Sequence, residues 1–399
     1  MNLSALREPE FRLYFSGAVA NVNAMWIVRI LIGWLAWEAT GSASFTGLVA
    51  AASLLPTLFG GPVFGVMVDR SDIRKAAYAT NISMILCILV MLSLHLSGAL
   101  GPTMLVAISL AIGTVTAAHH PVRLSLGPRL VPTSEVSSVV ALSALNFNVA
   151  RLISPAIGGL MIDRFGITIS IAVTVALFLP NLLIIARLHP RSLAQHSEQA
   201  FATAMREGLR YIATRRAIVI ILSATCVFSI SLRGVLEVLP IIADGAFNRG
   251  AVGFGQLGSA VGGGALCSAL AKTLGGGGQG QSKDALSPDK LAIAAIGLAA
   301  VATLGTTANW PTALACAAVL GATGTWFGVT MQQIIQADLP DDMRGRVMSI
   351  WVVVGLGSTA IGAWIIGALT DLVGLSPAFI AMAACGALTM FALSRATHK

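Results

Sequence analysis

Apolar residues dominate this chain in long runs, and short polar stretches separate one run from the next. Each run is about 20 residues long, which is the length that an α-helix needs to cross the hydrocarbon core of a bilayer. Because lipid offers backbone amides no hydrogen-bond partner, such runs must be helical. The pattern predicts twelve transmembrane helices, over residues 13–38, 46–68, 76–97, 102–122, 139–162, 168–187, 217–243, 251–271, 290–307, 311–335, 348–370 and 375–394.

Two long segments of the chain resemble each other. Residues 130–166 align without a gap with residues 338–374 when the sequence is shifted by 208 positions, so that Asp163 meets Asp371. The segments occupy the same place in the fifth and eleventh predicted helices. A duplication of six helices with parallel halves is typical of secondary transporters, which bind substrate near the membrane midplane between the halves. The repeat therefore predicts an all-α membrane protein built from two pseudo-symmetric six-helix bundles.

The duplication divides the chain into two bundles and a linker. The predicted bundles cover residues 1–187 and 217–399, and a polar linker of residues 188–216 joins them. Residues 201–218 of the linker and its border place apolar residues and arginines at helical spacing. We interpret this stretch as an amphipathic helix that lies on the inner membrane surface. A solvated linker helix is the alternative.

Composition and charge support a membrane protein and set its orientation. The chain is 56% hydrophobic and 11% charged, whereas soluble domains are about 25% charged. If the N-terminus is cytoplasmic, twenty Lys and Arg residues fall on the cytoplasmic side and two on the outer side. This asymmetry follows the positive-inside rule, so the net charge of +8 reflects topology rather than nucleic-acid binding. We expect both termini in the cytoplasm. The five cysteines lie inside apolar runs, without metal-ligand spacing.

Charged residues cluster between the second and third predicted helices, at Asp69, Arg70, Asp72 and Arg74. A carboxylate at Asp69, where the second helix ends, can meet the positive N-terminal end of another helix. Arg70 and Arg74 can pair across the cytoplasmic boundary between the halves. These contacts would exist only while the cytoplasmic side is closed, so we interpret the cluster as a gate. An ordinary positively charged loop is the alternative, but it does not account for the two aspartates.

The same stretch, from Gly65 to Arg74, resembles the signature that members of the major facilitator superfamily carry between helices 2 and 3. The Asp-Arg-x-Asp form is similar to the subgroup of enterobactin-exporter-like proteins, the transmembrane secretion effectors. The segments "NFNVARLISPAIGG" (146–159) and "LPDDMRGRVMSI" (339–350) also resemble patterns of that subgroup. The resemblance implies the major facilitator fold and a transport function.

A proline and two glycines follow one another in the fifth predicted helix. The run Ser154, Pro155, Gly158 and Gly159 is similar to a Gly-Pro-x-x-Gly-Gly run that the superfamily associates with antiporters. Proline removes a backbone hydrogen bond and kinks a helix, and glycines allow helices to approach closely. The resemblance favours export, with generic helix packing as the alternative.

Four charged residues lie inside predicted spans: Arg29, Arg151, Arg233 and Glu237. Charges in this position are costly and mark functional sites by default. Arg29 and Glu237 are equivalent under the 208-residue shift, so they can face each other across the pseudo-twofold axis. We interpret Glu237 as the proton-coupling carboxylate, with a structural Arg233–Glu237 pair as the alternative. Uncharged candidates for the substrate cavity are Asn21, Asn23, Trp26, Asn146 and Asn148.

Together these features predict a monomeric major facilitator in the bacterial inner membrane. We expect it to export a small amphipathic, drug-like or siderophore-like molecule, with the proton gradient as driving force and without a cofactor or metal. Uptake symport and lysolipid flipping are alternatives within the same fold, and a non-transporting receptor is the alternative from another class. The sequence shows no nucleophile constellation or paired metal motif that would indicate an enzyme.

The orientation can be tested by labelling introduced cysteines in intact cells. Cysteines at Ser71 and Ser282 should react only with reagents that enter the cytoplasm, because both positions lie in predicted cytoplasmic loops. Reaction of either cysteine with a membrane-impermeant maleimide added outside would contradict this topology.

Overall fold

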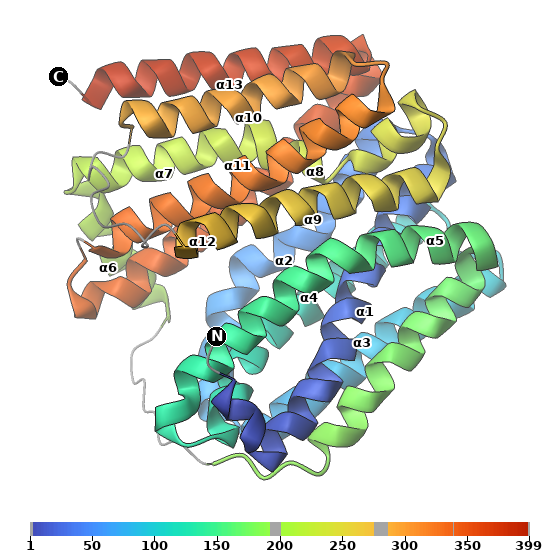
Figure 1. Ribbon diagram of the computed structural model, residues 1–399, viewed down its shortest axis with the longest axis vertical. Helices are drawn as coiled ribbons and strands as arrows, with labels where there is room; N and C mark the ends of the chain where they lie inside the picture. The colour runs from blue at the N-terminus through green and yellow to red at the C-terminus, as the bar shows by residue number, and fades with distance from the viewer. Residues whose placement is uncertain (1–2, 192–200, 275–285, 338, 398–399) are drawn as a thin grey trace.

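A computed structural model of the chain shows an all-helical architecture (Figure 1). It describes residues 3–191, 201–274, 286–337 and 339–397, and these contain no strand. The helices are α1 (Pro9–Thr40), α2 (Ala43–Arg70), α3 (Ile73–Leu96), α4 (Pro102–Leu126), α5 (Val136–Ile185), α6 (Phe201–Ala213), α7 (Arg216–Phe228), α8 (Gly234–Leu236), α9 (Gly250–Leu274), α10 (Pro288–Thr306), α11 (Trp310–Ala337), α12 (Asp341–Val373) and α13 (Leu375–Thr397).

The twelve predicted spans all correspond to helices. Nine helical stretches in the described part of the chain are long and apolar enough to cross a membrane. One of them contains α5, which breaks at Gly166, where φ is 77° and ψ is 170°. Only glycine adopts this conformation at little cost. The break divides α5 into two helices at the boundary between the fifth and sixth predicted spans, so α5 accounts for both spans. The remaining two spans are α2 and the glycine-rich α9.

The seventh span is irregular. It consists of α7, the π-helical segment η4 (Ser229–Arg233), the short α8 and a second π-helical segment, η5 (Ile241–Ala246). π-Helical turns change the angular spacing of side chains and are frequent at functional sites. Glu237 lies between the two π-helical segments, directly after α8.

Helices α1–α5 form an N-terminal bundle and α7–α13 form a C-terminal bundle (Figure 1). Helix α6, predicted as an amphipathic helix, lies against one end of α12, where Glu207 pairs with Arg346 at 2.7 Å. We call the side of the molecule with α6 and both chain ends the terminal side. There the ribbons of the two bundles diverge (Figure 1).

Glycines bring the two bundles together on the side opposite the termini. A Cβ added to Gly47 of α2 would overlap the backbone of Ala363 in α12. A Cβ added to Gly159 of α5 would overlap the backbone of Ala251 in α9. Such approaches bring backbones into van der Waals contact, which drives helix association in lipid. The bundles therefore close against each other on this side, which we call the closed side.

The closed contact predicts a large difference between two glycine-to-alanine variants. Gly159→Ala should destabilise the protein by about 1–3 kcal/mol, because the methyl group meets the backbone of α9 and forces the helices apart. Gly355→Ala is the matched control, since a Cβ there meets no atom within 4 Å. Thermal unfolding in detergent would measure both, and equal midpoints for the two variants would contradict the close packing.

Candidate functional site

An ion pair joins the two bundles across the boundary between them. Arg29 of α1 and Glu237, at the end of α8, form this pair between the positions that the sequence repeat makes equivalent. The Glu237 side chain is 12% exposed and that of Arg29 is 47% exposed. The carboxylate is therefore largely buried, while the guanidinium borders open space. Either a competing ligand for Arg29 or a proton on Glu237 would weaken the pair.

Trp26 and Arg151 lie beside this pair. The Trp26 ring has the Arg29 guanidinium 5.6 Å from its centroid and the Arg151 guanidinium 6.0 Å away. Both distances suit cation–π attraction, in which the negative face of the ring stabilises a cation. Phe147 of α5 packs on Trp26 with ring centroids 5.5 Å apart. Three predicted site residues, Arg29, Arg151 and Trp26, thus meet at one place.

Arg233 lies close enough to this group for its charge to act on Arg151, but it has a different partner. Its Nη2 donates to the carbonyl oxygen of Gly324 in α11 at 3.2 Å, and a side chain at Gly328 would collide with it. The alternative of an Arg233–Glu237 pair is therefore wrong. It assumed a regular helix through both residues, but α8 ends at Leu236 and Glu237 lies in the turn that follows.

Two of the asparagines predicted to line the substrate cavity lie inside the N-terminal bundle instead. Asn21 is 2% exposed and Asn146 is 8% exposed. Asn146 donates to the carbonyl oxygen of Ala18 at 3.2 Å. This corrects the prediction for both residues, because each satisfies its amide between packed helices rather than facing the other bundle.

The other two asparagines are half-buried and bound locally. Asn148 donates to the carbonyl oxygen of Ala144 in its own helix. Asn23 accepts a hydrogen bond from the hydroxyl of Ser154 at 2.7 Å, which ties α1 to the proline segment of α5. Gly158 in that segment packs against Ile30 of α1. The backbone of α5 stays helical through Pro155, so this segment acts here as a packing surface for α1 and α9.

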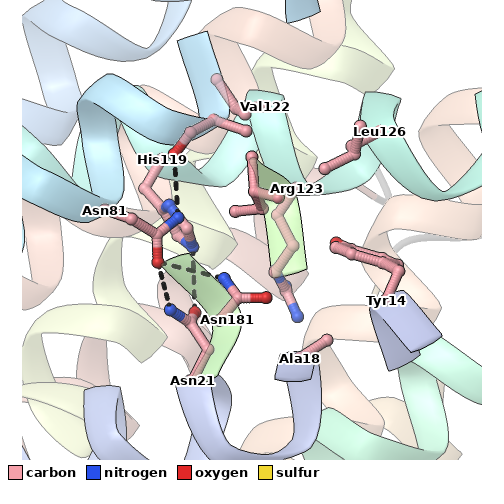
Figure 2. Close-up of a pocket in the computed structure, with 11 residues that line it drawn as sticks. Tyr14, Ala18, Asn21, Asn81, His119, Val122, Arg123, Leu126 and Asn181 are labelled. Carbon is pink, nitrogen blue, oxygen red and sulfur yellow. Dashed lines mark hydrogen bonds between the residues drawn. The ribbon is translucent and has the colours of Figure 1, made fainter. Parts of the chain in front are cut away.

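A buried polar network inside the N-terminal bundle was not predicted from sequence (Figure 2). Asn81 of α3 accepts from Asn21 at 2.7 Å and from Asn181 of α5 at 3.0 Å. His119 of α4 contacts Asn21 at 3.2 Å and Thr80 at 3.2 Å. The signal in the sequence was the presence of amide and imidazole side chains inside apolar helices, and the network uses one such side chain from each of four helices. Because these groups bind one another, the network ties the helices of one bundle together.

The predicted gate motif lies at the junction of α2 and α3. Gly65 lies inside α2, and the side chains of Asp69 and Arg70 lie outside the described residues. Asp72 caps α3, accepting hydrogen bonds from the backbone N–H groups of Arg74 at 2.9 Å and Lys75 at 3.3 Å. The Arg74 guanidinium donates to the carbonyl oxygen of Leu188 at 3.1 Å. In this conformation, Arg74 thus binds its own half of the chain.

Asp371 makes an inter-bundle contact that sequence reasoning missed. Its carboxylate, at the end of α12, accepts hydrogen bonds from the Ser42 hydroxyl and from the backbone N–H groups of Ala43 and Ser44. These groups form the N-terminal end of α2, so a carboxylate of one bundle caps a helix of the other. An anion at a helix N-terminus satisfies free N–H groups and the helix dipole. On the same side, Trp37 donates to Asp244 at 2.8 Å.

The chain matches a known family. The model of the transmembrane secretion effector family matches residues 1–398. The chain belongs to this family of the major facilitator superfamily. The multidrug efflux pump Tap of Mycobacterium tuberculosis is 24% identical over 398 residues, which cover 94% of this chain and 90% of Tap. The enterobactin exporter EntS of Escherichia coli O1:K1 is 24% identical over 393 residues, covering 92% and 87%.

Solved structures show the same fold for this transmembrane secretion effector. A bacterial homologue of the human lysosomal transporter Spinster, in an inward-facing and unoccupied conformation, matches with a TM-score of 0.74 at 12% identity. The match covers 97% of this chain and 98% of that structure. The protein is thus a multi-pass membrane transporter of small molecules rather than an enzyme. Its described residues contain no group of three His, Cys, Asp or Glu that could hold a metal ion.

The Asp371 cap predicts a specific effect on closure. Asp371→Ala should weaken the closed side by about 1 kcal/mol, the usual value of an N-cap, and lengthen the distance between the bundles there. Asp163→Ala is the matched control, since the carboxylate of Asp163 pairs with the adjacent Arg164 at 3.8 Å. Spin labels on cysteines at Phe165 and Ala308 would report this distance. Identical distance distributions for the Asp371 variant and the unmutated protein would rule out the cap as a gate.

Proposed function

We propose that this transmembrane secretion effector is a proton-coupled exporter of the bacterial inner membrane, with both termini in the cytoplasm. The observation that carries the proposal is the Arg29–Glu237 pair, which links the bundles through a carboxylate that protonation would neutralise. The names of Tap and EntS, an efflux pump and an exporter, support the direction of transport. We further propose that the transporter works as a monomer.

The asymmetric distribution of basic residues supports a cytoplasmic terminal side. With this orientation, the divergence of the bundles makes the conformation inward-open (Figure 1). The Arg29–Glu237 pair and the Asp371 cap then both stabilise closure of the outer side. Both must break when the transporter opens outward. In that opposite state, the gate residues Asp69 and Arg70 take over closure on the cytoplasmic side.

Proton coupling follows from the different surroundings of Glu237 in the two states. In the inward-open state Arg29 stabilises the ionised carboxylate, so a proton is released to the cytoplasm. When substrate separates Glu237 from Arg29 and the outer side opens, the carboxylate loses its partner and takes up a proton from outside. Substrate leaves, the outer side closes, and the pair re-forms as the proton is released inward. One cycle therefore exchanges substrate for a proton.

A Glu237→Gln variant tests the coupling role directly. The amide keeps the size and polarity of the side chain, so substrate binding should persist, but it cannot carry the proton. Proteoliposome export of radiolabelled enterobactin, the compound in the name of EntS, would be measured with and without an imposed pH gradient. The gradient should accelerate export by the unmutated protein and leave the variant at its gradient-free rate.

Glu38→Gln provides the matched control, because Glu38 is exposed near the end of α1 and should retain full acceleration. A Glu237→Gln variant that still responds fully to the gradient would reduce Glu237 to a structural partner of Arg29. Accumulation against the export direction would instead favour an uptake symporter, and binding without any transport would favour a receptor.

A further inference from the structure

The charges at the boundary between the bundles do not balance. Among the described residues, Arg29 and Arg233 lie within electrostatic range of Arg151, and Glu237 is the one carboxylate that acts on it. Glu237 is taken by Arg29, and Arg233 is bound by a backbone carbonyl. Arg151 has no carboxylate partner in the described part of the chain, and its described contact is the Trp26 ring. Cations at membrane depth are costly without a counter-ion, so this site carries positive charge that an anion would neutralise.

We propose that the exported substrate is an organic anion with a flat aromatic body, and that its anionic group binds Arg151 and Arg29. This inference rests on the export function proposed above and names the chemical class of its substrate. Guanidinium groups bind carboxylate, sulfonate and phosphate oxygens through paired N–H donors. Two guanidiniums near one indole ring therefore supply anion recognition and an apolar stacking surface together.

The aromatic and cationic groups continue from this site toward the terminal side. Phe147, 37% exposed, packs on Trp26, and the guanidinium of Arg123 in the last turn of α4 lies 5.3 Å from the Phe147 ring centroid. Arg123, Phe147, Trp26 and Arg29 thus form a row along the N-terminal bundle in which two packed rings lie between two cations. An aromatic anion that enters from the terminal side meets complementary groups at each step.

Anion binding also explains how substrate could break the pair between the bundles. A substrate anion on Arg29 takes the place of the Glu237 carboxylate, so the guanidinium never loses a counter-ion. A cationic substrate would have to enter a site with three guanidiniums and a single, already paired carboxylate. Electrostatic complementarity of this kind selects against ligands of the wrong charge.

Two probes with the same ring system and opposite charges test the substrate class. 1-Naphthalenesulfonate and 1-naphthylmethylammonium share one ring system and carry opposite charges. Their affinities would be measured by titration of the purified full-length protein in lipid nanodiscs. We expect the anion to bind at least about tenfold more tightly than the cation, the ratio that one charge-assisted hydrogen bond supplies.

Variants separate the anion site from general effects on folding. Arg151→Gln should weaken anion binding by about tenfold or more without weakening cation binding, because it removes a positive charge, and Arg151→Lys should recover part of the loss. Arg164→Gln, which removes an exposed arginine beyond the site, is the matched control and should change neither affinity. Glu237→Gln should tighten anion binding, because it removes the competitor for Arg29.

The outcomes distinguish this inference from the proposed function. Equal binding of the two probes, no binding of the anion, or an unchanged anion affinity in a folded Arg151→Gln protein would each overturn the anionic substrate class. None of these results bears on whether a pH gradient accelerates export. Conversely, selective anion binding in a protein whose export ignores the gradient would uphold the anion site and reject proton coupling.

Discussion

Arg29 and Glu237 stabilise each other's charges at membrane depth, and they belong to different bundles. Separating them exposes two uncompensated charges to a region where each costs several kcal/mol. The bundles therefore cannot part on the closed side unless something neutralises one member of the pair. A proton can do so at Glu237 and an anion can do so at Arg29, which is why one contact can connect substrate, proton and conformation.

The other contacts on the closed side between the two bundles are close backbone contacts and hydrogen bonds, which can separate together. Glycines in α2, α5, α9 and α12 let backbones touch through many small contacts. Asp371 caps α2 from the other bundle through hydrogen bonds. Such contacts are short-ranged, so a modest rotation of one bundle removes them together. In the mechanism proposed above, the terminal side, with its gate motif between α2 and α3, closes in the opposite state.

Rocking of this kind requires that each bundle moves as a rigid body. The Asn21–Asn81–Asn181–His119 network supplies rigidity in the N-terminal bundle, since its amides would be costly to leave unpaired in an apolar interior (Figure 2). In the C-terminal bundle, the π-helical segments leave the seventh span less regular. Glu237 lies between them, and π-helical turns are frequent at functional sites.

The sequence by itself determined the twelve spans, the duplication and the equivalence of Arg29 with Glu237. Span length, hydropathy and repeat register are all read directly from the order of residues, without knowledge of how the helices pack. It could not decide which polar side chains face the other bundle. Asn21 and Asn146 were expected at the boundary but lie within one bundle, whereas Trp26 lies beside the pair. Arg233 binds a backbone carbonyl oxygen of α11 instead of Glu237, and Asp371 caps a helix of the other bundle. Helix rotation and contacts between distant segments settle these positions, and both arise only when the bundles pack together.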